Sequence, residues 1–192
     1  MDTSLPDPAR LAARLAQLHK TSVSPTGQFG FHIPTCHGRF AQVVDWDPSW
    51  TSFFTKLLAG ALHQDKIKND PWPELDRVSD RVLTHVIPRL LGTLERDGRS
   101  VKPVLIHGDL WEGNIGTSSD TGDILIFDAG SYYAHSEMEI GMWRCTRHGI
   151  SSEVFLSEYL SIVDRSDPKE EWDDRNRLYC VKMNMVHSGH HK

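Results

Sequence analysis

The stretch that decides the fold covers residues 104–128, VLIHGDLWEGNIGTSSDTGDILIFD. Its two ends, VLIH and DILIF, are short, apolar and rich in branched side chains, whereas the middle is rich in Gly, Ser, Thr and Asp. This pattern predicts two buried strands joined through a loop and a turn. Asp109 and Asn114 lie on the loop, and Asp128 ends the second strand. We therefore expect three oxygen-bearing side chains to converge at one place.

Two carboxylates and one amide at one place suit phosphoryl transfer from ATP. In that chemistry one carboxylate positions the attacking hydroxyl and accepts its proton, while a carboxylate and an amide hold the Mg²⁺ that neutralises the triphosphate. The pattern HxDxxxxN, followed by an apolar strand that ends in Asp, matches the kinase catalytic core in order and spacing. The alternative is an ordinary polar hairpin whose Asp caps a helix. Because residue types, spacing and strand context agree, the sequence favours the kinase interpretation.

Two departures from protein kinases narrow this interpretation. Gly108 stands where protein kinases usually have the Arg that pairs with a phosphorylated activation loop. Asp128, Ala129 and Gly130 replace their Asp-Phe-Gly triplet. Both differences favour a small-molecule type of kinase that needs no loop phosphorylation.

The rest of the chain is dominated by helical patterns. Leu11, Leu15 and Leu18 share one stripe of an amphipathic helix, and residues 21–48 form a long connection. Further helices are predicted behind the start signal Asp47-Pro48, from about Glu74 to Glu95 with an interruption at Pro88, from about Ser152 to Val163, and from Pro168 to about Val186 with Asp167 as its cap. The predicted fold class is therefore α+β, mostly helical, with one strand-loop-strand insertion.

Composition limits the class of protein. The chain has 192 residues, enough for one domain with a real core, and a formal charge of −5, which gives no reason to expect a nucleic-acid partner. No apolar run approaches the roughly 18 residues of a membrane-spanning helix. The opening residues do not have the pattern of a secretory signal, so we expect a cytoplasmic protein without a membrane partner. The three cysteines include no CxxC pair, so a disulfide framework or structural zinc site is not expected.

Three segments resemble the fructosamine/ketosamine-3-kinase family, the protein-ribulosamine 3-kinases, which are relatives of the aminoglycoside and choline phosphotransferases. They are HGDLWEGNIG (107–116), IFDAGSYYAHSEMEIGM (126–142) and, upstream, FGFHIPTCHGRFAQ (29–42). Trp111 after HGDL and the YxHSExE pattern at 133–139 are the more specific marks. The resemblance extends from about Leu11 to His187, nearly the whole chain.

The resemblance implies a protein-kinase-like C-terminal (helical) lobe with a small β-hairpin carrying the catalytic loop, in one domain over residues 1–192. Members of this family use ATP and Mg²⁺ to phosphorylate O3 of the sugar in ribulosamine or fructosamine adducts. Such ketosamine adducts form on protein lysines, with small-molecule equivalents, and phosphorylation leads to protein deglycation. By position, Asp109 matches the catalytic base, and Asn114 and Asp128 match the ligands of the metal and the nucleotide. His107 matches the structural histidine of the loop.

The resemblance is incomplete at the start of the chain. Relatives of the family begin with a β-rich lobe that contains a phosphate-covering loop and a strand lysine that holds the α and β phosphates. Lys20 and Lys56 follow no apolar strand, and GxGxxG does not occur in the sequence. We expect the chain to be the catalytic lobe without its nucleotide lobe, clipped also at its end. Since phosphoryl transfer depends on positioning the donor, weak or undetectable activity is expected of the isolated chain.

Other residues near the motif have open roles. His107 and His135 could be metal ligands, but hydrogen bonding to the backbone or loop is the more ordinary role for them. Glu137 and Glu139 are expected to brace the loop against the helical core. Trp46 could line a sugar site, and so could the run Ser131, Tyr132 and Tyr133, which follows the metal-binding Asp. Two alternatives also remain for the whole chain: a catalytically dead scaffold that serves protein interactions, and an aminoglycoside- or choline-type phosphotransferase.

Overall fold

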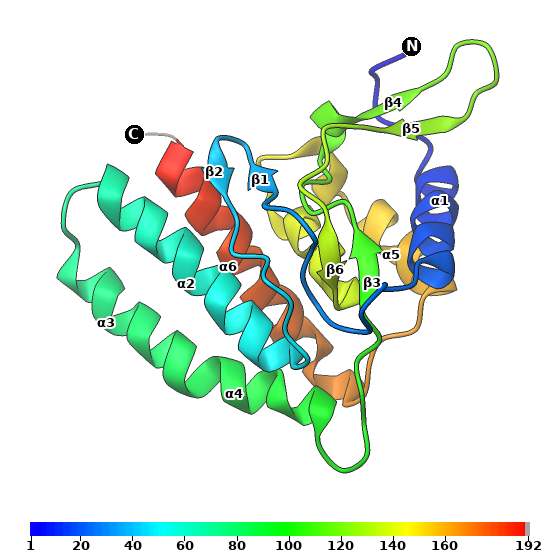
Figure 1. Cartoon of the computed structure of the whole chain (residues 1–192). Coiled ribbons are helices and arrows are strands. Elements are labelled where there is room, and N and C mark those ends of the chain that lie inside the picture. The colour runs from blue at the N-terminus through cyan, green and yellow to red at the C-terminus, as the bar shows by residue number, and fades with distance from the viewer. Residues whose placement is uncertain (191–192) are drawn as a thin grey trace.

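The structure, a computed structural model, describes residues 1–190, and helices make up most of it (Figure 1). This agrees with the predicted mostly helical α+β class. The long helices are α1 (Pro8–Thr21), α2 (Trp50–Lys68), α5 (Glu153–Ile162) and α6 (Trp172–His190); α3 (Pro73–Arg81) and α4 (Ile87–Leu90) are shorter. The strands are β1 (Cys36–His37), β2 (Phe40–Ala41), β3 (Val104–Ile106), β4 (Ile115–Thr117), β5 (Ile124–Ile126) and β6 (Tyr132–Ala134).

Local signals set the helix starts, with one correction. In α1 the Asp7 side chain accepts the Arg10 N–H, and the Leu11 and Leu15 stripe is fully buried, as predicted. In α2 the cap is Ser49, which accepts the Ser52 N–H, rather than the predicted Asp47. Asp47 instead accepts the backbone N–H of Ser49 and the hydroxyl of Ser52, and so it supports the cap from two residues upstream.

The predicted helix over residues 74–95 is interrupted, but not by a simple kink. Between α3 and α4 the chain forms a π-helical turn over Val82–Val86, in which the Ile87 N–H donates to the Val82 carbonyl. Pro88 has no N–H to donate to the preceding turn, and its ring crowds the carbonyl four residues earlier. A widened π turn just before the proline relieves both problems.

The two predicted strands form, as β3 and β5, but they pair differently from the prediction, and four further strands occur among residues 1–190. The two predicted strands do not pair with each other in one hairpin. Instead β3 pairs antiparallel with β6, and β5 pairs antiparallel with β4, which begins directly after Asn114. The predicted pairing of these two strands is therefore wrong, because β4 after the catalytic loop pairs with β5, and β6 after the Asp128 turn pairs with β3. The loop and the Asp128 turn thus each lie between two small sheets.

The last helix, α6, packs against two other parts of the fold. It begins at Trp172, after a 3₁₀ turn over Lys169–Glu171, rather than at the predicted Pro168, and it continues to His190. One side of α6 packs against α2, and another packs against η4 (Ser136–Arg144), the long 3₁₀ segment that follows β6. On the other side of the molecule α1 packs against α5 and β3 (Figure 1).

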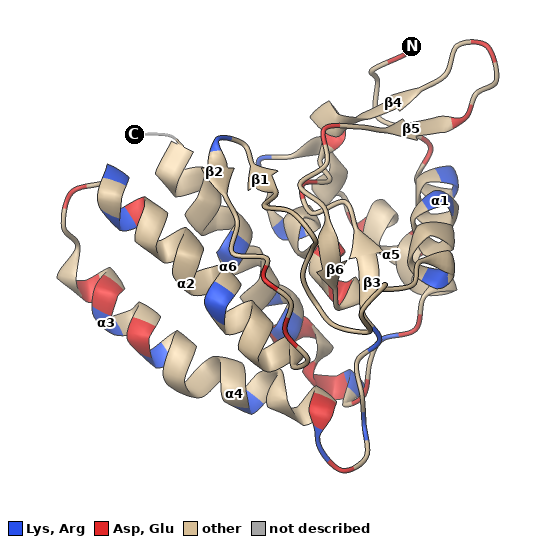
Figure 2. Ribbon diagram, in the orientation of Figure 1, with Lys and Arg blue, Asp and Glu red and all other residues tan. Residues whose placement is uncertain are grey.

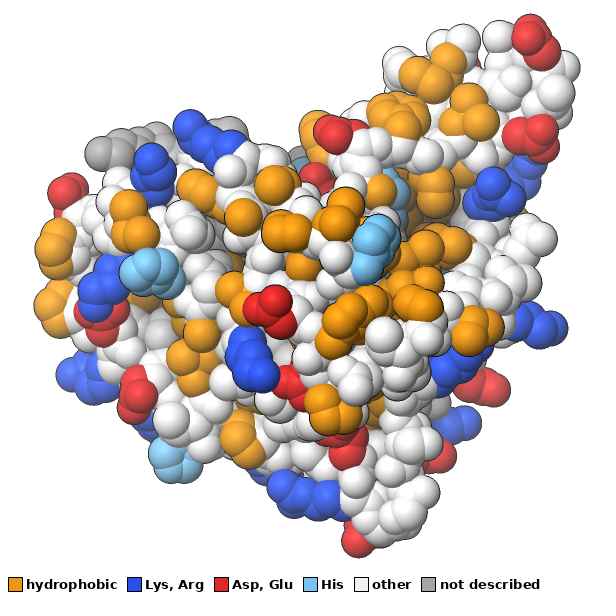
Figure 3. All heavy atoms as spheres, viewed as in Figure 1, with side chains coloured by type: hydrophobic (Ala, Val, Ile, Leu, Met, Phe, Trp, Pro, Cys, Tyr) orange, Lys and Arg blue, Asp and Glu red, His pale blue; other side chains and the backbone are white. Residues whose placement is uncertain are grey.

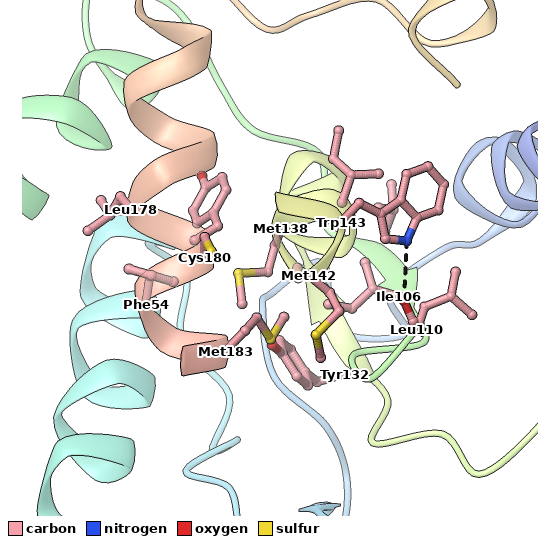
Figure 4. Packing of buried hydrophobic residues seen from close by; sticks show 14 of the residues in the cluster. Phe54, Ile106, Leu110, Tyr132, Met138, Met142, Trp143, Leu178, Cys180 and Met183 are labelled. Carbon is pink, nitrogen blue, oxygen red and sulfur yellow. Dashed lines mark hydrogen bonds between the residues drawn. The ribbon is translucent and has the colours of Figure 1, made fainter. Parts of the chain in front are cut away.

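A continuous core lies directly below the catalytic loop (Figure 4). Leu110 of the loop is fully buried, and the Trp143 indole N–H donates to its carbonyl at 3.2 Å. Met138, Met142 and Met183 fill the space between η4 and α6. Because this core holds Leu110 in place, the neighbouring Asp109 has a defined position at the edge of the core.

The charged side chains are spread over the surface, and residues of both signs lie along α3 (Figure 2). The hairpin of β4 and β5 projects from the body, and hydrophobic side chains are visible on it in Figure 3. Leu125 and Phe127 of this hairpin are exposed. Within residues 1–190 no helix is both long and apolar enough to cross a membrane.

Candidate active site

The backbone of the catalytic loop is hydrogen-bonded to one buried carboxylate. Glu139 of η4 is fully buried, and it accepts the backbone N–H of His107 at Oε2 and that of Gly108 at Oε1, the latter at 3.0 Å. Burial alone would raise the pKa of Glu139, but the neighbouring His19 and His107 and the donated N–H hold it below its usual value. The loop backbone is therefore fixed to the helical core by a charged acceptor, which agrees with the bracing role expected of Glu139.

His107 links the loop to the end of β5. Its Nδ1 lies 3.3 Å from the Asp109 N–H and accepts from it, so Nε2 carries the ring proton and donates to the Phe127 carbonyl at 2.8 Å. Both ring nitrogens are thus used within the chain, as expected for a structural rather than a metal-binding histidine. Gly108 adopts φ +82°, and a Cβ there would lie 2.6 Å from the Gly130 carbonyl oxygen. Only glycine fits this close approach of the two loops.

Asp109 and Asn114 contact each other at this junction, and the backbone of Asp128 lies beside them. Asn114 Nδ2 donates to the Asp109 backbone carbonyl at 2.9 Å and lies 3.4 Å from Asp109 Oδ2. The same Nδ2 lies 3.5 Å from the Asp128 carbonyl. Asp128 has φ +57°, a left-handed conformation that Asp tolerates, and it turns the chain directly after β5. The loop and the strand end are therefore adjacent through Asn114.

The donor set fits a magnesium ion. Because the Asn114 amide N–H₂ points to the loop carbonyls, its Oδ1 faces the other way and has no hydrogen-bond partner among residues 1–190. Asn114 is buried, whereas the Asp128 side chain is exposed. Mg²⁺ is usually bound by one or two protein oxygens together with substrate phosphates and waters. An amide oxygen without a partner and an exposed carboxylate are ligands of the types that this requirement names.

Asp109 lies at the edge of a cavity of about 310 Å³. Trp111, Arg147 and His148 line it on the loop side, and residues of α6 line it on the other. The Trp111 ring lies 5.3 Å from the His148 ring. A cavity of this size and mixed lining suits a small polar ligand such as a sugar. Trp111 therefore lies where the sequence places it, beside the catalytic loop.

The electrostatic environment keeps Asp109 ionised. Burial would raise the pKa of this carboxyl, but the hydrogen bond from His37 and the positive charge of Lys182 outweigh it, so the pKa lies below its usual value. The Asp109 side chain is only 17% exposed, and its Oδ1 lies 3.0 Å from His37 Nε2. A half-buried carboxylate that stays ionised can position a hydroxyl group and accept a proton from it.

His37 and Lys182 are site residues that the motif analysis missed. His37 lies on the β1–β2 hairpin, inside the long connection over residues 21–48, and Lys182 lies on α6. Lys182 Nζ lies 3.1 Å from His37 Nδ1, and both side chains are buried. One signal was available: Lys182 lies on the apolar stripe of α6 that includes Leu178 and Met183, where a charge is rarely found without a partner.

Two residues expected near the site serve the core instead. His135 is buried, with Nδ1 2.8 Å from the Tyr179 hydroxyl and Nε2 2.8 Å from Ser166 Oγ. Glu137 forms a buried ion pair with Arg175 at 2.8 Å and accepts the Ser166 N–H. Glu137 therefore braces η4 against α6 and the segment before it, rather than the catalytic loop. Neither residue contacts Asp109, Asn114 or Asp128 in the described part of the chain.

The aromatic residues considered for a sugar site also differ in whether they are buried or exposed. Tyr132 is fully buried, and so it cannot reach an acceptor sugar. Tyr133 is partly exposed and stands between Trp46, with ring centres 6.0 Å apart, and Phe31, at 6.2 Å. Of the sequence candidates, Trp46 and Tyr133 therefore form one aromatic cluster on the surface. No contact joins this cluster to Asp109 among the described residues.

Comparison with known proteins agrees with this geometry. The model of the fructosamine kinase family matches residues 3–190. The chain belongs to the fructosamine kinase family. It is 32% identical over 176 residues to the chloroplastic protein-ribulosamine 3-kinase of Oryza sativa subsp. japonica, covering 90% of this chain and 47% of that protein. It is also 32% identical over 164 residues to the ketosamine-3-kinase of Mus musculus, covering 85% of this chain and 48% of that protein.

Solved structures show the same fold. A crystal structure of a candidate fructosamine-3-kinase from Thermobifida fusca superposes with a TM-score of 0.73 at 18% identity, covering 99% of this chain and 67% of that one. One from Haemophilus somnus gives 0.71 at 22% identity, covering 98% and 60%. This member of the family therefore spans about half the length of the curated relatives named above.

Proposed function

We propose that this chain carries the catalytic residues of an ATP-dependent kinase that phosphorylates O3 of the sugar in ketosamines. The acceptors are ribulosamine or fructosamine adducts on protein lysines or on small amines, as the names of the relatives suggest. The observation that carries the proposal is that Asp109, at the edge of a cavity of about 310 Å³, contacts Asn114, whose Nδ2 lies beside the backbone carbonyl of Asp128.

Each residue has a separate role in this proposal. Asp109 accepts a hydrogen bond from the sugar hydroxyl and takes its proton as the new bond forms. Asn114, through Oδ1, and Asp128, through its carboxylate, hold the metal ion. When bound, Mg²⁺-ATP supplies the phosphoryl group and the positive charge that stabilises the transition state. Glu139 and His107 keep the loop backbone rigid, so that these groups hold their relative positions.

The cavity supports a polar acceptor. Trp111 offers an apolar ring face of the kind on which sugar rings pack, and Arg147 and His148 offer hydrogen-bond donors. Asp109 is at its edge, so a hydroxyl of a bound sugar reaches the carboxylate directly. The same geometry accommodates other polyhydroxylated amines. An aminoglycoside- or choline-type acceptor is therefore a second candidate, to be compared in the same assay.

We propose that the 192-residue chain alone turns over slowly. Among residues 1–190 no lysine lies on a strand at a distance suited to hold the phosphates of a nucleotide at Asp128. Without such a contact the donor is poorly positioned. A coupled ADP-release assay with ribulosamine and fructosamine substrates tests this, and aminoglycosides and choline serve as comparison acceptors. Turnover of order 1 s⁻¹, the low end for kinases, would contradict the slow-turnover proposal.

A calorimetric titration separates the kinase from a scaffold that serves only protein interactions. A kinase lobe with intact metal ligands should bind ATP in the presence of Mg²⁺ and lose that binding with EDTA. Asp128→Asn should weaken the binding by removing one anionic ligand, whereas Asp120→Asn, an exposed residue in the β4–β5 turn, should leave it unchanged. Absence of any Mg²⁺-dependent ATP binding would favour the scaffold.

A further inference from the structure

The geometry points to His37 and Lys182 as positioning residues for the catalytic carboxylate. In this inference His37 holds Asp109 in its reactive orientation, and Lys182 holds His37 in the tautomer that does so. The inference rests on the proposed function, because it gives Asp109 the role of the base. Neither residue belongs to the HGDLWEGN motif, and both come from elements distant in sequence, β1 and α6.

The backbone carbonyl of Gly130 can only accept hydrogen bonds. The Gly130 carbonyl accepts from Gln42 Nε2 at 2.9 Å, so the amide of Gln42 has a defined orientation. Thr35 Oγ1 lies 3.2 Å from the same Nε2 and supports this assignment. The Gln42 Oε1 atom must then face the opposite side, where Lys182 Nζ lies at 2.7 Å. Lys182 is therefore the donor in that bond.

Lys182 in turn sets the state of His37. A protonated Lys has three N–H donors and no acceptor, so the 3.1 Å contact with His37 Nδ1 requires an unprotonated Nδ1. In the neutral ring the proton then resides on Nε2. Nε2 is the atom that lies 3.0 Å from Asp109 Oδ1. Every donor and acceptor from Gly130 to Asp109 is thus assigned without conflict, with Lys182 donating both to Gln42 and to His37.

Burial restricts these side chains to the hydrogen-bond partners that the chain itself provides. Lys182 is 1% exposed and His37 is 8% exposed, so water cannot easily replace a lost partner. Burial, together with the charge of Lys182, lowers the pKa of His37 to about 4, so the ring is neutral at pH 7. Burial also lowers the pKa of Lys182 to about 7, against the raising effect of Asp109 and Glu139. A neutral Lys182 still has two N–H donors for Gln42 and His37, and because ionised Asp109 can only accept, the His37 proton stays on Nε2 and Nδ1 remains the acceptor.

The hairpin that carries His37 is itself held in place. Gly38 has φ +57° and closes the turn between β1 and β2. The Arg39 N–H donates to His190 Nε2 at 3.1 Å, and its guanidinium donates to the His190 carbonyl at 2.9 Å. The hairpin is thus attached to the end of α6, the same helix that supplies Lys182. The chain of hydrogen bonds joins the Asp128–Gly130 turn to Asp109 by a second route, independent of Asn114.

The first experiment reads the tautomer directly and needs no activity. The ¹⁵N resonances of the imidazoles are recorded on the 192-residue chain, and His37 is assigned by its absence in His37→Gln. We expect one state of the His37 ring at pH 7, with a proton on Nε2 and none on Nδ1. A proton on Nδ1 in the wild-type chain would overturn the inference, whatever the behaviour of any variant.

Lys182→Met removes the donor to Nδ1, and Lys68→Met, on the exposed end of α2, is the matched control. We expect the His37 signals of Lys182→Met to show a mixture of tautomers or a protonated ring, while the control matches the wild type. The backbone amide spectrum reports whether each variant is folded. A folded Lys182→Met chain with the wild-type His37 signals would overturn the part assigned to Lys182.

The second experiment measures ADP release. In His37→Gln the side-chain amide can still reach Asp109, whereas the shorter side chain of His37→Asn cannot. We expect kcat to fall about 10- to 100-fold in His37→Asn, the usual effect of losing a group that orients a reacting one, and less than about 3-fold in His37→Gln. KM for the sugar should change less than about 3-fold in both. His63→Gln, an exposed histidine of α2, is the control.

The outcomes test the positioning role of His37 and the proposed kinase function separately. Equal kcat values for His37→Asn and the wild type would overturn the positioning role while the proposed kinase function stands. A wild-type chain that releases no ADP with any acceptor would contradict the proposed activity of this chain, and the ¹⁵N spectra would then decide the inference on the arrangement of His37 and Lys182.

Discussion

Asp109 and Glu137 are two carboxylates that each contact a basic side chain, yet their surroundings differ. Glu137 is buried against Arg175, which is fully buried, and both of its oxygens accept hydrogen bonds from within the chain. Asp109 has one oxygen bonded to His37, and its other oxygen receives only the long 3.4 Å contact from Asn114. Asp109 also lies at the edge of a cavity, whereas Glu137 is enclosed by η4 and α6.

This difference distinguishes carboxylates that stabilise the fold from carboxylates that can take part in a reaction. A carboxylate whose acceptor positions are all occupied by its own chain can only stabilise that chain. A carboxylate that keeps one direction open toward a cavity can accept a proton from a ligand. Glu139 belongs to the first class although it is close to the motif, because it is fully buried and holds two backbone N–H groups. The predictions below test this division.

The largest expected effect is on Asp109. Asp109→Asn should lower kcat for ADP release by about 10² to 10⁴, because an amide cannot accept the proton of the sugar hydroxyl. Mg²⁺-ATP affinity should change less than about 3-fold, since Asp109 is not assigned to the metal. Single-turnover ADP release and calorimetry measure the two effects, with Asp120→Asn as the control. An Asp109→Asn chain with wild-type turnover would remove Asp109 from the chemistry.

The next effect is on stability, at Glu137. Glu137→Ala leaves the Arg175 guanidinium buried without its partner, and we expect the free energy of unfolding to fall by about 3 to 5 kcal/mol. Urea denaturation followed by circular dichroism measures it. Asp76→Ala, which breaks the exposed Lys66–Asp76 pair, should cost less than about 1 kcal/mol. Equal losses in both variants would show that burial does not distinguish these ion pairs.

A smaller effect is expected at Glu139. Glu139→Gln keeps the shape of the side chain but can accept only one of the two loop N–H groups, and its own N–H₂ opposes the other. We expect a loss of about 1 to 3 kcal/mol in the free energy of unfolding, together with slower ADP release as the loop loosens. Glu153→Gln, at an exposed position on α5, is the control for urea denaturation. An unchanged melting curve and rate would place Glu139 outside the support of the loop.

Over a single pH unit, the smallest effect per residue is that of two buried histidines on stability. Burial lowers the pKa of His135 to about 4 and that of His37 to about 4. The unfolded chain therefore binds protons between about pH 6.5 and 4 that the folded chain does not, so stability falls as the pH falls through this window. Each histidine should contribute about 1 kcal/mol per pH unit.

Urea denaturation at pH 7, 6 and 5 measures this slope. His135→Asn and His37→Asn should each remove about half of the histidine contribution, one from the core and one from the site. His63→Asn, which is exposed, should leave the slope unchanged. Stability that is constant over this range would contradict the neutral state of both buried rings.

The sequence predicted the local features well and the pairing of strands poorly. VLIH and DILIF both form strands, but β3 pairs with β6, which includes two of the residues that the sequence suggests only as possible sugar contacts, Tyr132 and Tyr133. The choice among partners depends on which strands the loops bring together, and an apolar pattern does not record it. His135 and Glu137 were expected near the site for a similar reason: they are close to Asp128 along the chain, but η4 turns them into the core.

The sequence by itself determined the catalytic loop, because HGDLWEGN and the strand that precedes Asp128 act through short separations along the chain. Within such distances backbone geometry restricts where side chains can point. Only the tertiary structure decided what surrounds Asp109. His37 and Lys182 are 145 residues apart, and they meet because the β1–β2 hairpin is held against α6. Contacts of that kind follow from the packing of whole elements, which no local pattern of residue types contains.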